Sequence, residues 1–188
     1  WVSFFSIAFG LFTAVMDASM IGIALPSISK DFSLDLSSAA WISLVSTITV
    51  VAVLLPMGNI SDRLGRKKIY LLGVIVTAIG SLLCSFSNEI FSLLIFRIIV
   101  AISAAMRMST GLAMVMMIFK DKERGKGLGA NTTTVGLAAI TGPIFGGLLV
   151  GSFGWESIFI TQAFLSIPAF ILGYIFLDKA IVDLNQNY

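Results

Sequence analysis

Three charged residues stand inside long apolar stretches of this sequence: Asp17, Arg97 and Arg107. A charge within the hydrocarbon of a bilayer is costly, so such residues usually line a cavity, pair with an opposite charge or relay protons. If these stretches are membrane helices, Asp17 and Arg97 both lie ~10–12 Å below the same boundary. We therefore expect an ion pair or a shared hydrogen-bond network, in which Asp17 takes and releases a proton beside Arg97. The alternative is a static structural ion pair.

Arg107 should lie elsewhere. It is ~15 Å further along the same predicted helix than Arg97 and about a quarter turn out of phase, so the two arginines do not share a face. Arg107 either contributes to a cavity or extends its long side chain toward the nearer boundary.

The composition indicates a protein that needs lipid as part of its solvent. Hydrophobic residues make up 57% of the 188 residues and charged residues 12%, against about 25% charged residues in typical soluble domains. The mean hydropathy is +1.01. The net charge of +2 comes from two basic clusters and does not indicate nucleic acid. A single cysteine and no histidine exclude an internal disulfide and a cysteine-based metal site.

Six stretches reach the length of about 20 apolar residues that a spanning helix needs. The predicted helices are 2–25, 39–60, 69–87, 90–119, 128–153 and 157–177. There is no strand pattern, phosphate-binding loop or nucleophile constellation, so we expect an all-α membrane protein that is not an enzyme and binds no cofactor or metal.

The basic residues of the links predict the orientation. The second link holds Arg63, Arg66, Lys67 and Lys68, and the fourth holds Lys120, Lys122, Arg124 and Lys126. The third and fifth links hold no basic residue, and the first holds only Lys30. Loops rich in lysine and arginine stay in the cytoplasm. Both chain ends are therefore expected on the cytoplasmic side of the cell membrane, in a multi-pass protein.

The second link contains more than basic residues. Gly58 would permit close approach of another helix and Gly65 a tight turn, and Asp62 can pair with a nearby arginine or a helix N-terminus. An ordinary positive-inside loop would have the charges without this spacing. The spacing resembles the cytoplasmic signature loop of the major facilitator superfamily, which latches the two halves of these transporters in the outward-facing state. The matching residues are Gly58, Asp62, Arg63, Gly65, Arg66 and Lys67.

Two further strings carry the resemblance. The string 16–26, which contains Asp17, resembles the first-helix signature of the fourteen-helix drug–proton antiporters, except that Gly22 replaces the usual asparagine. In the fifth predicted helix, small residues permit close helix contact and Pro143 removes one backbone hydrogen bond. A kinked packing helix without a directional role would have the same features. This string resembles the antiporter motif through Gly142, Pro143, Gly146 and Gly147.

The resemblance weakens in the fourth predicted helix. Arg97 matches the arginine of the drug antiporters, but Val100 and Ala101 replace the glutamine and glycine that commonly follow. Methionines crowd the second half of this helix, where they would form an adaptable pocket or serve as packing and lipid-facing residues. They are Met106, Met108, Met114, Met116 and Met117.

The resemblance implies six helices in two inverted three-helix repeats, forming the N-terminal half of a transporter whose C-terminal half lies outside this sequence. It further implies export of small hydrophobic or cationic compounds by alternating access, driven by the proton gradient. Two alternatives stay open. One is a specific metabolite exporter or importer of the same superfamily, and the other is a non-transporting, half-length membrane subunit.

Overall fold

The computed structural model describes residues 2–119 and 123–177, so the predicted basic residues Lys120 and Lys122 lie outside the described residues. The described residues form six α-helices, each long and apolar enough to cross a membrane. The helices are α1 (Val2–Asp31), α2 (Leu36–Leu64), α3 (Arg66–Ser85), α4 (Ile90–Ile118), α5 (Arg124–Phe153) and α6 (Glu156–Phe176). The prediction of an all-α protein with six candidate spans is confirmed.

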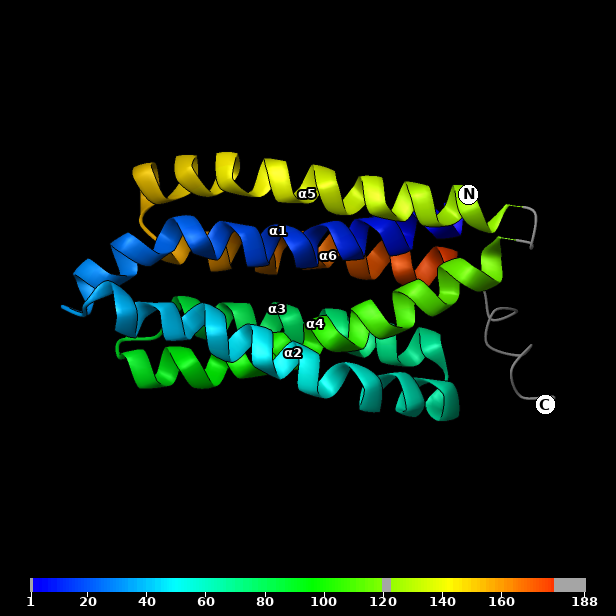
Figure 1. The fold of residues 1–188 in the computed structure, drawn as a ribbon, viewed down its shortest axis with the longest axis horizontal. Helices are drawn as coiled ribbons and strands as arrows, with labels where there is room; N and C mark the ends of the chain where they lie inside the picture. Colours follow the sequence, from blue (N-terminus) through cyan, green and yellow to red (C-terminus); the bar gives the residue numbers. More distant parts are fainter. Residues whose placement is uncertain (1, 120–122, 178–188) are drawn as a thin grey trace.

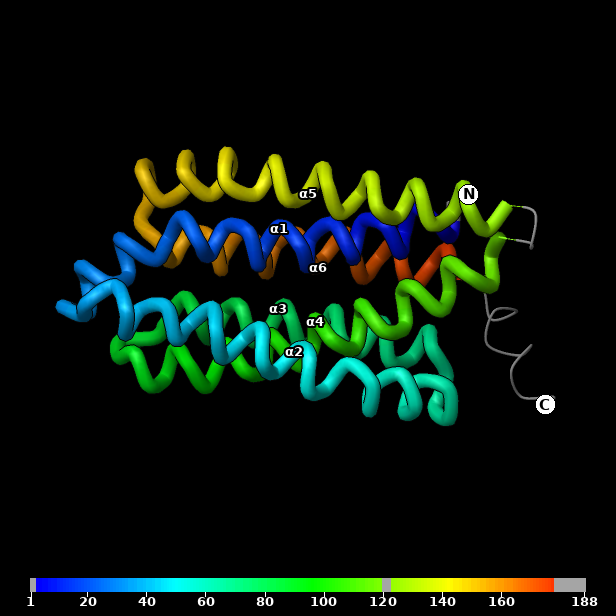
Figure 2. The backbone as a smooth tube through the Cα atoms, viewed as in Figure 1, coloured from blue at the N-terminus to red at the C-terminus, as the bar shows by residue number. Residues whose placement is uncertain are grey.

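Consecutive helices run in opposite directions along one bundle (Figure 1). The tube through the backbone shows that α1 begins and α6 ends at the same end of the bundle (Figure 2). Gly65 joins α2 to α3 at this end, and α4 ends and α5 begins there as well. We call it the basic end because Arg66, Lys67 and Lys68 lie there.

Helix α1 lies along α5, and α2 lies along α4. Helix α3 contacts both α4 and α6. Helices α2 and α5 lie at the periphery, since the few residues they bury are mostly small ones where they meet their neighbours. One apolar core surrounds Met20, Leu93 and Phe159, and a second surrounds Tyr70 and Met114.

Helix α1 continues past the predicted end at Leu25 and reaches Asp31 with Pro26 inside it. Proline removes only one backbone hydrogen bond, and packing offsets that loss. Ile28 is fully buried, and the indole Nε1 of Trp155 donates a hydrogen bond of 2.7 Å to Asp31 Oδ2. Contacts with the start of α6 therefore extend this helix beyond its proline.

The predicted loop between the second and third helices is almost absent, which corrects the sequence-based bounds. Helix α2 runs to Leu64 and α3 begins at Arg66, so the signature residues are helical on both sides of Gly65. Gly65 has a φ of 97°, a backbone conformation that glycine adopts without a steric cost. One glycine is therefore enough to turn the chain here.

Candidate functional site

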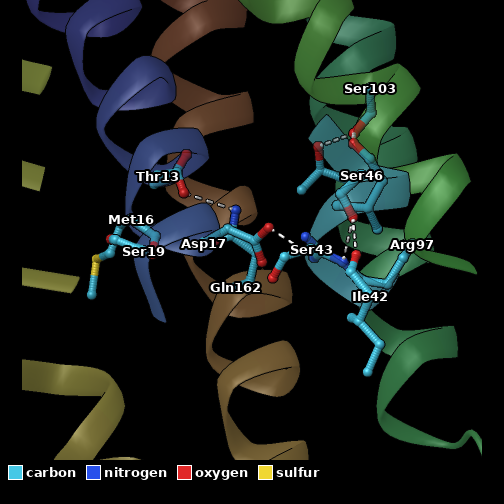
Figure 3. Close-up of polar contacts among 12 residues, drawn as sticks. Thr13, Met16, Asp17, Ser19, Ile42, Ser43, Ser46, Arg97, Ser103 and Gln162 are labelled. Atoms are coloured by element: carbon cyan, nitrogen blue, oxygen red, sulfur yellow. Dashed lines mark hydrogen bonds and ion pairs between the residues drawn. The ribbon is translucent and has the colours of Figure 1, made fainter. Parts of the chain in front are cut away.

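Asp17 of α1 and Arg97 of α4 form an ion pair in the interior of the bundle. Arg97 Nη1 lies 2.9 Å from Asp17 Oδ2, and the two residues are 3% and 5% exposed, respectively. Figure 3 shows the pair bridging the space between α1 and α4. The predicted ion pair, argued from equal depth and opposite charge, is confirmed.

Arg97 is held by α2 and α6 as well. Its Nε donates a hydrogen bond of 3.2 Å to Ser46 Oγ, whose hydroxyl in turn donates to the carbonyl of Ile42. The guanidinium carbon lies 5.8 Å from the centre of the Phe159 ring, within cation–π range. Neither Ser46 nor Phe159 was expected from the sequence, where a serine and a phenylalanine in apolar helices carry no distinguishing signal.

The second carboxylate oxygen of Asp17 has no hydrogen-bond partner among the residues that the structure describes. This oxygen, Oδ1, is buried and accepts no hydrogen bond from residues 2–119 or 123–177. The residue lines a cavity of about 230 Å³, together with Ser46, Arg97 and mostly apolar side chains of α1, α2 and α4. A buried carboxylate with one oxygen paired and the other unoccupied is able to accept a proton at the unoccupied oxygen. The geometry therefore suits exchange of one proton beside a small apolar space.

Arg107 is separate from this pair, as its helical phase predicts. It is 2% exposed, and its Nη1 donates hydrogen bonds of 3.1 Å to the Gly10 carbonyl and to Thr13 Oγ1 of α1. The interpretation that its side chain extends to the boundary is wrong, because these contacts hold it inside the bundle. Arg107 also lines a second cavity, of about 130 Å³, between α1, α4 and α5.

Gln162 of α6 is a polar residue that the sequence analysis did not single out. Its Nε2 donates a hydrogen bond of 3.1 Å to the Thr13 carbonyl, and its buried Oε1 has no hydrogen-bond partner in the described part of the chain. Figure 3 shows it beside Asp17. A lone amide in an otherwise apolar helix was the available signal. Of the five methionines in the second half of α4, Met108 lines both cavities.

The glycines of the α5 motif lie against the Asp17 segment of α1. A Cβ atom at Gly142 would overlap Ser19 Oγ, and one at Gly146 would lie 3.2 Å from Met20 Cγ. Gly147 has more space, since a Cβ there would meet Ile23 at 4.0 Å. Two of the predicted motif glycines thus let α5 approach the helix that carries Asp17.

The signature residues connect four helices, α2, α3, α4 and α6, at the basic end. Asp62 pairs with Arg66, at 2.7 Å, across the break at Gly65. Arg66 also donates to the Met117 sulfur at 2.6 Å, and Lys67 donates to the Tyr174 carbonyl at 2.9 Å. A Cβ at Gly58 would meet nothing within 4 Å, so no described residue makes the close helix contact predicted there.

Comparison with known proteins places the chain. The family model described as Major Facilitator Superfamily matches residues 7–184. The riboflavin transporter RibZ of Clostridioides difficile (strain 630) is 37% identical over 187 residues, which cover all of this chain and 41% of that protein. The multidrug transporter protein MdtP of Bacillus subtilis (strain 168) is 28% identical over 177 residues, covering 94% of this chain and 32% of that protein.

A crystal structure of the peptide transporter POT in complex with sulfate superimposes with a TM-score of 0.84 at 16% identity, covering 95% of this chain and 38% of that one. This likeness shows the fold alone. The chain spans about two fifths or less of the length of these three proteins. The matched family consists of transporters rather than enzymes. The chain belongs to the major facilitator superfamily.

Proposed function

We propose that this chain forms the first half of a proton-coupled exporter of small hydrophobic compounds, working by alternating access in the cell membrane. The observation that carries the proposal is the buried pair of Asp17 and Arg97 on the wall of a cavity, where no described residue donates a hydrogen bond to Asp17 Oδ1. Intramembrane carboxylates in such positions typically mark proton pathways.

The coupling would work through the ion pair. A proton on Asp17 removes the charge that balances Arg97, and an unpaired buried charge is strongly unfavourable. Arg97 must then find another partner or gain water, which favours a different arrangement of α1 and α4. Protonation and the conformational equilibrium thereby depend on one another. The reverse step, release of the proton, restores the pair. The signature residues at the basic end would latch one of the two arrangements.

The membrane orientation and the half-transporter arrangement are part of the proposal. The basic residues at one end of the bundle favour a cytoplasmic position for that end, and thus for both ends of the chain. In two inverted repeats, α1 corresponds to α4 and α2 to α5. If α1 is exchanged with α4 and α2 with α5, the pairing of α1 with α5 becomes the pairing of α4 with α2. Both pairings are present, which supports the inverted repeats. The second half would follow residue 188 and complete the cavity.

A second candidate is transport of one specific metabolite. The similarity to the riboflavin transporter, at 37% identity along the whole chain, favours it. The two candidates differ in selectivity. A multidrug exporter would move several unrelated hydrophobic dyes, whereas a specific transporter would move one solute and its near analogues.

The test uses the full-length protein in proteoliposomes with an imposed pH gradient. Asp17→Asn should abolish gradient-driven transport while leaving the protein folded, because the amide does not take up a proton. Asp35→Asn is the matched control, since Asp35 is an exposed carboxylate in the link before α2, away from the cavity. Retention of full coupling by Asp17→Asn would sink the proposal. Efflux of a single compound class would favour the metabolite transporter.

A further inference from the structure

Arg107 is a buried cation that forms no ion pair with any described residue. Asp17 is paired with Arg97, and no carboxylate of the described residues lies within ion-pair distance of Arg107. Among the described residues, its Nη1 bonds only to neutral oxygens, of Gly10 and Thr13, and its buried Nε has no hydrogen-bond partner. A buried charge without a counter-charge is energetically unfavourable unless an oppositely charged or polar group lies beside it.

The cavity beside Arg107 has room for a group that could pair with its charge. The cavity of about 130 Å³ is lined by Arg107 together with Leu11 of α1, Gly111 of α4 and Asn131 of α5. Asn131 adds a neutral polar side chain to a lining that is otherwise mostly apolar. The distance along the α4 axis from Arg107 to the helix end at Ile118 is ~16 Å. The head groups of lipids therefore do not reach the depth of Arg107.

The two cavities are neighbours, because Met108 lines both. Methionine is flexible and adapts to ligands of different shape. The cavity on one side of Met108 contains the ion pair of Asp17 and Arg97. The cavity on the other side contains Arg107, which has no ion-pair partner among the described residues. One elongated ligand could lie along both spaces, with an electron-rich group at Arg107.

We propose that the Arg107 cavity is a substrate subsite for an anionic group, so that the transporter prefers anionic over cationic hydrophobic solutes. This inference rests on the proposed transport function and narrows its substrate class, away from the cations that sequence resemblance implies. A guanidinium offers several donors in a plane and binds carboxylate and phosphate groups well. The same charge repels a cation from the pocket.

Two xanthene dyes of similar shape test the preference: fluorescein, an anion at pH 7.5, and rhodamine 123, a cation. Their dissociation constants are measured by fluorescence polarisation with purified full-length protein in detergent. We expect fluorescein to bind at least tenfold more tightly than rhodamine 123. Arg107→Gln should weaken fluorescein binding at least tenfold without weakening rhodamine 123, and Arg107→Lys should retain part of the preference. Rhodamine 123 binding as tightly as fluorescein would overturn the inference.

A second variant covers the possibility that Arg107 is needed for folding, since it also joins α4 to α1. Asn131→Asp leaves Arg107 and its contacts in place and adds a carboxylate to the same cavity, so the dye preference should fall severalfold. Asn88→Asp is the matched control, because Asn88 is exposed in the link between α3 and α4. An unchanged preference in Asn131→Asp, or an equal loss for both dyes in Arg107→Gln, would refute the subsite.

The binding assay needs no proton gradient, so it is independent of the proposed coupling. If proteoliposomes showed no gradient-driven efflux of either dye while fluorescein binding still depended on Arg107, the proposed function would fail and the subsite would stand. If efflux were proton-coupled but binding showed no dependence on dye charge, the subsite alone would fail.

Discussion

Gly142 of α5 lies so close to Ser19 of α1 that a Cβ atom at position 142 would overlap the serine hydroxyl. Ser19 cannot yield easily, because its hydroxyl donates to the backbone carbonyl of Met16 at 3.0 Å, and that carbonyl would also lie 3.1 Å from the new Cβ. The approach of α5 to the segment that carries Asp17 therefore depends on a glycine at this position.

Gly142→Ala should destabilise the protein by about 1–3 kcal/mol, the usual cost of inserting a methyl group into a packed interface. The measurement is thermal unfolding of the full-length protein in detergent. Gly136→Ala is the matched control on the same helix, where a Cβ would meet nothing within 4 Å. It should be neutral or stabilise by up to about 1 kcal/mol, since alanine favours helix over glycine. Equal effects of the two substitutions would contradict the close contact.

Replacing one residue of the buried ion pair should lower the free energy of unfolding more than replacing both residues. Arg97→Gln leaves the Asp17 carboxylate buried without its counter-charge, and such changes typically cost about 3–5 kcal/mol. The double variant Asp17→Asn with Arg97→Gln removes both charges and should recover much of that loss. A double-mutant cycle of unfolding temperatures measures the coupling. Additive losses would mean that the pair does not contribute as a unit.

The contact between Asp62 and Arg66 should matter more for transport than for stability. Asp62 is 53% exposed, and exposed ion pairs typically contribute about 0.2–1 kcal/mol. Asp62→Asn should therefore lower the unfolding temperature little. It should reduce transport severalfold, because Arg66 loses the partner that orients it toward α4. Lys68→Gln, at an exposed position on the same helix end, serves as the control. A transport loss no larger than that of the control would argue against a latch.

The orientation can be tested by cysteine labelling of intact cells in a Cys84→Ala background. Cysteine is placed either at Lys68, at the basic end, or at Asn88, in the link between α3 and α4 at the opposite end. Because basic segments remain in the cytoplasm, a membrane-impermeant maleimide should label position 88 in intact cells. Position 68 should react only after permeabilisation. The reverse pattern would place both chain ends outside.

The partnership of Asp17 and Arg97 could be predicted from the sequence, whereas its surroundings could not. Depth in a membrane helix follows directly from residue number, and two opposite charges at one depth have a strong reason to meet. Ser46, Phe159 and Gln162 complete the site, but they belong to two predicted stretches without a charge, 39–60 and 157–177. Sequence spacing within one helix does not tell which residues of another helix lie opposite.

The helix bounds show the same division. The apolar lengths of the six spans predicted their number and order, because lipid demands about 20 apolar residues for each crossing. The continuation of α1 past Pro26 and the near absence of a loop at Gly65 required the structure. The continuation of α1 depends on its contacts with Trp155. The short connection depends on the positive φ of Gly65 and on the ion pair between Asp62 and Arg66.

By itself the sequence determined that this is a six-span membrane protein of a transporter family, and that Asp17 and Arg97 belong together. Only the tertiary structure decided which faces of the helices meet. The physical reason is that lipid-facing and core-facing surfaces are both apolar, so the hydrophobic pattern of a membrane helix does not mark its buried side. The rotation of each helix about its axis and the order of the helices in the bundle are therefore set by tertiary packing. They determine that α1 packs on α5, that Arg107 has no ion-pair partner among the described residues, and that Met108 lines both cavities.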